Sequence, residues 1–251
     1  MISPRPNRAP AVRLVCIPHA GGGVGTFAGW PDRLPASELN IVQLPGRGTR
    51  LREAPLASVA QAADGLALAI GRLPAYPTVL FGHGLGALIA FETARRLHSR
   101  AWPLVALFPS GCRAPQLPGR GALLADLSEP DFVEEVRRRS GELPEAIFAD
   151  GELRQVTVAA LRSEFAMAAS YGYEEGEPLE CPIVACGGRG DDGATREELE
   201  AWKAQTRGRA GVRLFEGGPL YLLQERSALT GLIANQLTVL LGAMSRWTAV
   251  P

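Results

Sequence analysis

Short apolar runs alternate with stretches of helical spacing along most of this chain. Runs of only a few residues, bounded by glycine, proline or polar residues, are too short for helices and predict buried strands. The runs that fit this description are Val12–Ile17, Asn40–Leu44, Thr78–Phe81, Pro103–Phe108, Ile183–Cys186 and Val212–Phe215.

Between these runs, apolar residues recur every three or four positions, which is the spacing of a helix with one buried face. The segments with this spacing are Leu56–Leu73, Leu85–His98 and Tyr221–Leu241. Strands that alternate with helices of this length predict an α/β fold, with a mostly parallel central sheet flanked by helices.

One long segment, residues 117–173, interrupts the alternation. It contains helical patterns at Asp131–Arg139 and Leu153–Ser170 but no convincing strand. We therefore expect a core formed by residues 1–116 and 174–251, with 117–173 inserted as a helical lid over the carboxyl edge of the sheet, where ligands bind in such folds. The alternative is an insertion that only stabilises the fold, but long insertions at that edge usually serve a site.

Composition narrows the class of protein. The chain of 251 residues is 46% hydrophobic, and its 26 basic and 26 acidic residues give a formal net charge of zero. With no long basic run and no apolar run long enough to span a membrane, neither nucleic acid nor a membrane is an expected partner. The N-terminal sequence has no signal-peptide pattern, and the four cysteines fit neither a zinc site nor a disulfide framework. We expect a cytoplasmic monomer without metal or cofactor.

The stretch VLFGHGLGA, at residues 79–87, is the most informative motif. An apolar strand enters a glycine-rich turn, and a helical pattern follows. In a nucleophile elbow this turn has the pattern G-x-S-x-G, and its Ser attacks the substrate. Here the flanking glycines Gly82 and Gly86 are present, but Gly84 stands at the position of the nucleophile. The turn is therefore expected to form without its reactive side chain.

Several stretches together make the chain resemble the type II thioesterases of polyketide and nonribosomal-peptide pathways, a family of the α/β-hydrolase superfamily. The resemblance covers Leu14 to about Leu241. The stretches that carry it are LVCIPHAGGG (14–23), VQLPGRGTRL (42–51), LFGHGLGALIAFETARRL (80–97), LFPSGCRAP (107–115), CGGRGDD with EELEAW (186–202) and FEGGPLYLL (215–223). The resemblance implies an α/β-hydrolase fold that accepts acyl groups carried on the phosphopantetheine arm of a carrier protein.

The resemblance also locates a degenerate catalytic triad. Gly84 replaces the Ser, and Pro219, after Gly217 and Gly218, stands where the family has its catalytic His. Two losses in one triad make a single engineered change an unconvincing explanation. The acid is implied at Asp191, which could instead be an ordinary turn or helix-capping residue.

One half of the expected site, which we call the polarising half, would polarise the substrate carbonyl and needs only backbone N–H groups. The resemblance implies an oxyanion hole made by the N–H of Leu85 and that of Ala20 or Gly21. We name Gly21 as a candidate substrate contact for the same reason.

Further side chains are candidates for acid–base work. His19 and His83 flank the expected pocket, although each fits equally well a role in holding a loop by hydrogen bonds. Tyr221 is a candidate substrate contact or proton donor, for which packing is the alternative. Cys112 could serve as a replacement nucleophile only with a base beside it.

Three functions remain open at this point. The first is a non-hydrolytic enzyme that catalyses cyclisation, isomerisation or elimination on a polyketide- or peptide-type acyl substrate, using the oxyanion loop and Asp191. The second is an editing thioesterase that hydrolyses carrier-protein thioesters without a triad. The third is a non-catalytic protein that binds a carrier protein or an acyl chain.

Overall fold

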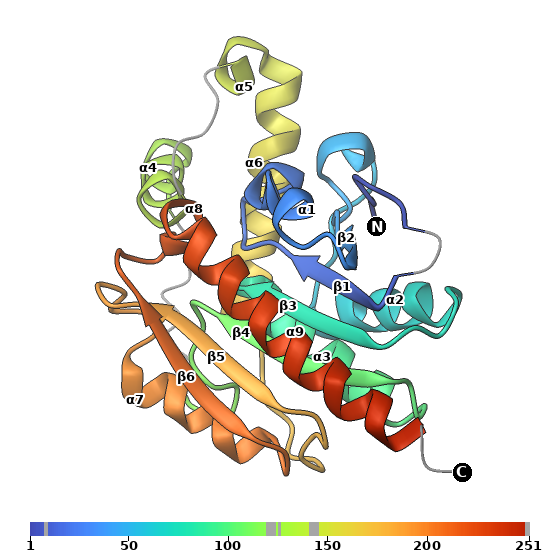
Figure 1. Ribbon diagram of the computed structural model, residues 1–251. Coiled ribbons are helices and arrows are strands. Elements are labelled where there is room, and N and C mark those ends of the chain that lie inside the picture. The colour runs from blue at the N-terminus through green and yellow to red at the C-terminus, as the bar shows by residue number, and fades with distance from the viewer. Residues whose placement is uncertain (8–9, 119–123, 125–126, 141–145, 249–251) are drawn as a thin grey trace.

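The computed structural model describes residues 1–7, 10–118, 124, 127–140 and 146–248. Its centre is a six-stranded sheet with the strand order β2-β1-β3-β4-β5-β6, and all neighbouring strands pair in parallel (Figure 1). The strands are β1 (Val12–Ile17), β2 (Ser37–Ile41), β3 (Thr78–His83), β4 (Leu104–Ser110), β5 (Ile183–Gly188) and β6 (Ala210–Phe215). The predicted parallel α/β fold is confirmed.

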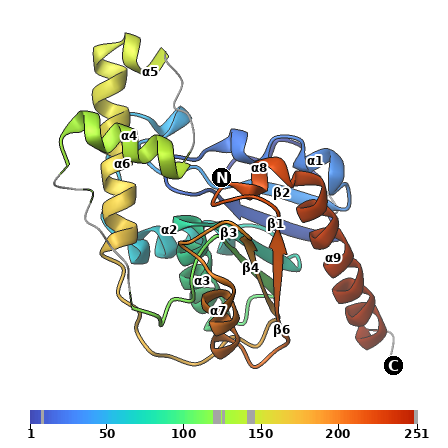
Figure 2. The same ribbon diagram turned by 90° about the vertical axis from the view of Figure 1, so that its left-hand side faces the viewer.

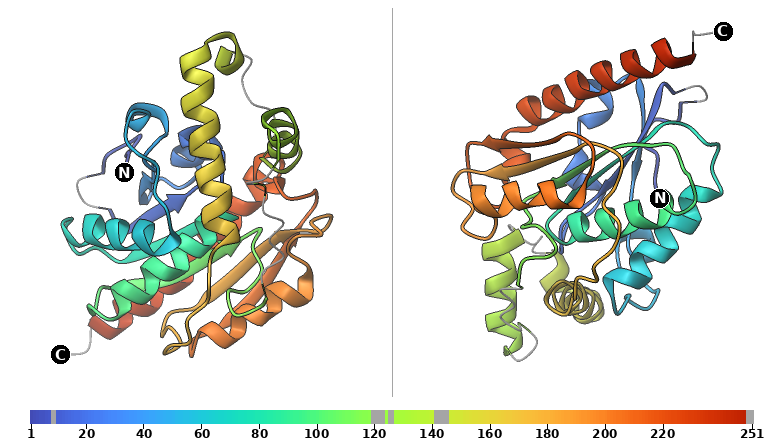
Figure 3. Two further views of the ribbon diagram at one scale, coloured as in Figure 1. Left: turned by 180° about the vertical axis from the view of Figure 1, so that it is seen from behind. Right: turned by 90° about the horizontal axis from the view of Figure 1, so that it is seen from below.

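Helices cover both faces of this sheet (Figures 2 and 3). One face carries α2 (Val59–Gly71), α3 (Leu85–His98) and the short α7 (Arg196–Glu200), while the other carries α1 (Trp30–Arg33), α8 (Tyr221–Gln224) and α9 (Arg226–Thr248). Three short 3-10 turns complete this part of the chain: η1 (Val24–Phe27), η2 (Gly48–Arg50) and η4 (Ala201–Gln205).

Burial on both faces explains why the strands are continuous apolar runs rather than alternating ones. In β1, Leu14 and Cys16 belong to the core under α9, whereas Val15 and Ile17 belong to the core under α2 and α3. All four side chains are fully buried.

Most predicted elements differ from the observed ones by one to three residues at an end, and two differ in a way that has a structural reason. The second strand was expected at Asn40–Leu44 but is Ser37–Ile41, because its pairing with β1 stops at Cys16 opposite Ile41. Val42 and Leu44 are nevertheless buried in the core as loop residues, which gave them the appearance of a strand. The closing helix is divided into α8 and α9 at Glu225, whose ψ of 26° departs from helical geometry.

The segment between β4 and β5 contains α4 (Glu129–Ser140), α5 (Ala146–Ala149) and α6 (Gly151–Ala169). Its described residues form no strand up to Tyr173. α4 and α6 share a small apolar core of their own, with Phe132 and Leu161 fully buried. The Asp150 carboxylate caps α6 by accepting the Leu153 N–H at 3.0 Å. Within the described residues, no helix is both long and apolar enough to cross a membrane.

Candidate functional site

The turn after β3 keeps the backbone geometry of a nucleophile elbow. Gly84 has φ 55° and ψ −120° and stands just before the first residue of α3. Its N–H donates to the Ser110 carbonyl at 2.9 Å. The flanking glycines are sterically required, because a Cβ at Gly82 would lie 2.0 Å from the Gly86 carbonyl oxygen.

A side chain at Gly84 itself would meet less obstruction. A Cβ there would lie 3.4 Å from the His19 Cβ, which is an ordinary contact. The positive φ still strains any residue other than glycine. The turn therefore has the shape of an elbow and space for a side chain, while Gly84 provides no nucleophilic group.

The candidate oxyanion donors lie on either side of this turn. Leu85 begins α3, so its N–H points out of the first helical turn, where no intrahelical acceptor exists. Ala20 is buried in the loop after β1. The N–H of the next residue, Gly21, is directed elsewhere and donates to the Glu164 carboxylate at 2.7 Å.

His83 belongs to a closed hydrogen-bond chain. Its Nε2 donates to the Pro219 carbonyl at 2.8 Å, and its Nδ1, also at 2.8 Å, accepts from the Ser110 hydroxyl. Ser110 in turn accepts from the Tyr221 hydroxyl at 2.6 Å. Burial, aided by the nearby His19, lowers the His83 pKa to about 3, so the ring is neutral. Both ring nitrogens are used in holding β3 and β4 to the loop after β6.

His19 lies edge-on to His83, with ring centroids 5.7 Å apart. Its Nδ1 donates to the Ala20 carbonyl at 2.9 Å and so braces the loop after β1. Burial lowers its pKa, and the Ala20 carbonyl and Glu164 act in the opposite direction. His19 is only partly buried.

Asp191 lies in the loop after β5, against the loop after β6. The Gly190 N–H donates to the Gly217 carbonyl at 2.9 Å, which joins the two loops. Asp191 is 7% exposed, and its Oδ1 accepts the Gly193 N–H at 2.9 Å. Burial raises its pKa, although the Gly193 N–H opposes this shift. Pro219 is exposed, and its ring offers no proton-transfer group where the His was expected.

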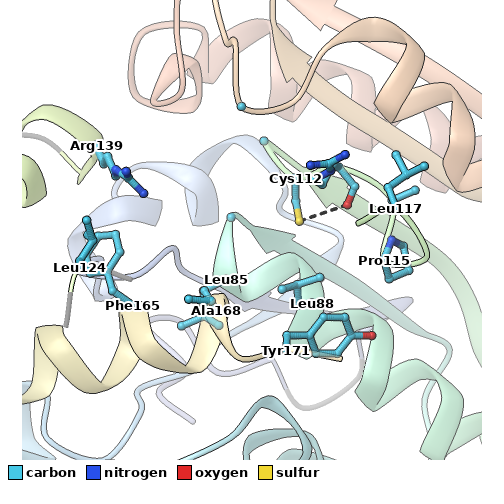
Figure 4. Close-up of a pocket in the computed structure, with 16 residues that line it drawn as sticks. Leu85, Leu88, Cys112, Pro115, Leu117, Leu124, Arg139, Phe165, Ala168 and Tyr171 are labelled. Atoms are coloured by element: carbon cyan, nitrogen blue, oxygen red, sulfur yellow. Dashed lines mark hydrogen bonds between the residues drawn. The ribbon is translucent and has the colours of Figure 1, made fainter. Parts of the chain in front are cut away.

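A cavity of about 340 Å³ opens at the elbow, between the sheet edge and the inserted helices. Figure 4 shows Phe165 and Ala168 of α6 on one side of it, Cys112 and Leu117 on the other, and Leu85 between them. The lining is mainly apolar; its polar side chains are Cys112, Arg113, Arg139 and Tyr171. Such a cavity suits an acyl chain.

The structure brings only some of the expected site residues to this cavity. Gly84 and Leu85 line it, and Gly193 brings the Asp191 loop to its wall. The remaining candidates do not line it: Ala20, Gly21, His19, His83, Asp191, Pro219 and Tyr221. Tyr221 is 1% exposed and is bonded to Ser110.

Cys112 does line the cavity, but its chemistry is unfavourable for attack. Burial is the main cause that raises the pKa of its thiol to about 12, and the charge of Asp191 is the second. Its Sγ donates weakly to the Arg113 carbonyl at 3.4 Å. Among the described residues, no group of three or more His, Cys, Asp or Glu side chains is placed to hold a metal ion.

Three further residues at or near the cavity, Arg113, Arg139 and Glu164, were not predicted from the sequence. Arg113 was visible as part of the quoted LFPSGCRAP stretch, and its Nη2 pairs with Glu198 at 3.0 Å. Glu164 left one signal, a lone carboxylate three residues after the buried Leu161 on the apolar side of α6.

A parallel sheet with an elbow after β3, a carboxylate loop after β5 and a short loop before the last helices defines an α/β-hydrolase-fold protein. The family model "Thioesterase domain" matches residues 12–237, and the chain belongs to this family.

Two curated proteins match nearly the whole chain. The chain is 38% identical to the gramicidin S biosynthesis protein GrsT of Aneurinibacillus migulanus, over 94% of this chain and 92% of GrsT. It is also 38% identical to thioesterase PikA5 of Streptomyces venezuelae, over 96% of this chain and 85% of PikA5.

Solved structures agree with the sequence relatives. The type II thioesterase BorB from the borrelidin biosynthetic cluster superposes with a TM-score of 0.83 at 35% identity, covering 94% of this chain and 96% of BorB. YbtT, the type II thioesterase of the yersiniabactin pathway, superposes with a TM-score of 0.84 at 30% identity, covering 96% and 98%. The resemblance inferred from the motifs is thus confirmed.

Proposed function

We propose that this protein binds a polyketide- or peptide-type acyl group, delivered on the phosphopantetheine arm of a carrier protein, and acts on it without forming an acyl-enzyme. One observation carries the proposal. The cavity opens at an intact elbow that holds Gly84 in place of a nucleophile. A hydrolase of the Ser-His-Asp type needs both the Ser and the His, and Gly84 and Pro219 supply neither.

The retained backbone suits chemistry at a carbonyl. The N–H groups of Leu85 and Ala20 would hold the substrate carbonyl oxygen as negative charge develops on it. Asp191 is the candidate base, because burial raises its pKa toward the working range of a general base. Asp191 lies just outside the lining, so its side chain would turn past Gly193 to take a proton from the carbon next to the carbonyl. The resulting enolate would attack a second carbonyl of the chain to form a ring, regain the proton at another carbon, or expel a hydroxide that leaves as water with that proton.

The inserted helices would act as a lid that encloses the chain. The wall of Phe165, Ala168 and Leu88 accepts apolar carbons, whereas Arg113 and Arg139 bring positive charge to the same cavity. The names of GrsT and PikA5 are consistent with an acyl substrate from an antibiotic pathway.

A second candidate is a non-catalytic protein that binds an acyl chain or its carrier. Its support is specific: His19, His83 and Asp191 all lie outside the cavity lining. A third candidate, hydrolysis by water that Asp191 or His19 activates, would rely on the oxyanion hole alone, which gives only residual catalysis in enzymes stripped of their triad.

Intact-protein mass spectrometry separates the three. A carrier protein loaded with a pathway-like acyl chain is incubated with and without this protein, and the chain is then released chemically and analysed. A changed chain structure on a still-loaded carrier supports the proposal. Bare carrier and free acid would establish hydrolysis. An unchanged, still-attached chain together with measurable binding would favour the non-catalytic candidate.

A matched variant assigns the proton transfer. Asp191→Asn keeps the size of the side chain and an oxygen for the Gly193 N–H, but it removes the base. It should abolish any change in chain structure while leaving acyl-carrier binding within about threefold. Unaltered turnover in Asp191→Asn would remove Asp191 from the mechanism.

A further inference from the structure

A buried carboxylate of α6 reaches across to the loop that carries the candidate oxyanion donor Ala20. Glu164 is 4% exposed although it is charged. Its Oε1 accepts the Arg47 Nε at 2.8 Å, and its Oε2 accepts the Arg47 Nη2 at 2.9 Å. The same Oε2 accepts the Gly21 N–H at 2.7 Å. Three segments far apart in the sequence therefore meet at this one side chain.

The Gly21 bond has a defined consequence for the loop. Gly21 has φ 86°, a left-handed conformation that glycine adopts freely and leaves as freely. Its N–H immediately follows Ala20 along the chain. Fixing the Gly21 N–H therefore fixes the peptide plane that joins Ala20 to Gly21 and restrains the direction of the neighbouring Ala20 N–H.

Arg47 accounts for the charge at this position. A bare carboxylate beside an oxyanion hole would oppose the negative charge that the hole must stabilise. The two parallel hydrogen bonds from Arg47 neutralise the Glu164 carboxylate. The pair can therefore hold the loop without that electrostatic penalty.

The rest of α6 is seated closely on the same part of the core. A Cβ at Gly46 would lie 3.1 Å from the Cβ of Ala160, so helix and loop approach each other tightly there. The Ser163 hydroxyl donates to the Leu56 carbonyl at 2.7 Å. Residues 160, 163 and 164 share one face of the helix. Glu164 reaches Gly21 only while this face is seated.

We propose that Glu164 is a positioning residue, which holds the oxyanion loop in its working geometry only while α6 is seated on the core. Its positioning of the loop stands on the contacts alone, and the benefit to a bound carbonyl rests on the proposed function. Arg47 is its neutralising partner. Movement of the inserted helices would in this way switch carbonyl polarisation on and off.

Hydrogen exchange tests the positioning directly, without a substrate. In Glu164→Ala, amides in residues 18–23 should exchange at least about tenfold faster than in the wild type, because the Gly21 N–H loses its acceptor. Ser163→Ala is the matched control. It removes one contact between α6 and the core but none to the loop, and the Gly46–Ala160 approach and the Arg47–Glu164 pair still seat the helix, so exchange in residues 18–23 should stay within about twofold of the wild type.

Glu164→Gln is a milder variant that separates the loss of the Gly21 bond from general unfolding. It keeps an acceptor oxygen for Gly21 but places an NH₂ group where Arg47 needs an acceptor, so its effect on residues 18–23 should be intermediate. Exchange in β3 and α3 must stay at the wild-type rate in every variant compared. Wild-type protection of residues 18–23 in a folded Glu164→Ala protein would overturn the proposal.

Infrared spectroscopy tests whether Glu164 affects the polarisation of a bound carbonyl. An octanoyl thioester of N-acetylcysteamine, labelled with ¹³C at the carbonyl, is bound to each variant and its C=O stretch is recorded. The stretch should be lowered in the wild type and in Ser163→Ala, and return toward its solution value in Glu164→Ala while the Kd changes less than about threefold. An equal shift in all three proteins would contradict the coupling. If the wild type does not bind this probe, the proposed function fails for that ligand and the exchange result alone decides the role of Glu164.

Discussion

The two halves of the candidate site differ in whether their polar groups face the cavity or are bonded to one another. The polarising half, at the ends of β1 and β3, keeps an intact elbow, and Gly84 and Leu85 open into the cavity. The proton-handling half, at the ends of β4, β5 and β6, is closed on itself. There Tyr221 and Ser110 bond to His83, which reaches over from the end of β3, in a chain that ends at the Pro219 carbonyl.

This difference is what the proposed function requires. A backbone oxyanion hole depends on how the chain folds, so it would persist with glycine in place of a nucleophilic Ser. A proton relay depends on side chains, and at Pro219 the backbone carbonyl is already bonded to His83. A site of this kind would hold a carbonyl without the proton transfers of a Ser hydrolase.

The largest expected effect comes from rebuilding the missing half. Gly84→Ser with Pro219→His should raise thioester hydrolysis by at least about 10³-fold, whereas each single variant should gain less than about tenfold, because triad members act as a unit. Space for a Cβ exists at Gly84. The His83 bond to residue 219 uses a backbone carbonyl and should persist. Thiol release from an acyl thioester measures the rate.

A third substitution controls this experiment. Adding Asp191→Asn to the double variant should remove most of the gain if Asp191 orients the new His. Equal rates for Gly84→Ser alone and for the double variant would show that another base already serves the elbow.

The fold was accessible from sequence because its signals are local. Each strand was recognised from its own apolar run, and the elbow from its own glycines. The misplaced second strand shows the limit: Val42 and Leu44 are buried loop residues, and burial alone does not distinguish a loop from a strand. The one-residue break at Glu225, between α8 and α9, left no local signal in the sequence.

The site was only partly accessible for a related reason. Motif positions located Gly84, Pro219 and Asp191, but they did not say which side chains face the cavity. The Glu164–Arg47 pair joins residues 117 positions apart, and nothing near either residue indicates the other. For His83, both an acid–base and a loop-holding role were open, and its two hydrogen bonds show that it holds the loop.

Cys112 follows β4 and lines the cavity, so its reactivity tests whether the proton-handling half supplies a base to the cavity. Its pKa of about 12 leaves little thiolate near neutral pH. Its greater intrinsic nucleophilicity offsets part of this loss, so alkylation by iodoacetamide should be roughly 50-fold slower than for free cysteine. Peptide-level mass spectrometry reads the rate. Labelling as fast as free cysteine would reveal a base beside the thiol and reopen its role as a nucleophile.

Lowering the pH should destabilise the hydrogen-bonded half of the site, because His83 is held there in its neutral form. Folded His83 remains neutral down to about pH 3, whereas an unfolded His binds a proton near pH 6.5. Between these values the unfolded chain binds more protons, so stability falls as the pH is lowered. The loss from His83 should be about 2 kcal/mol between pH 7 and pH 5. Urea unfolding at several pH values measures it.

The matched control for this pH dependence is His98, which is exposed at the end of α3. His83→Gln should flatten the dependence between pH 7 and pH 5, and His98→Gln should leave it as in the wild type. A slope that survives in His83→Gln would assign the titration to another group, of which His19 is the first candidate.

The smallest effect is expected at Pro219, and it tests whether the closed half depends on backbone or on side chain. Pro219→Ala keeps the carbonyl that accepts from His83 and removes only an exposed ring. Stability should fall by less than about 1 kcal/mol, mainly through greater freedom of the unfolded chain. Urea unfolding of the wild type and of Pro219→Ala measures this change in stability. A loss above about 2 kcal/mol would mean that the proline ring itself, and not only the backbone carbonyl, sets the conformation of the loop after β6.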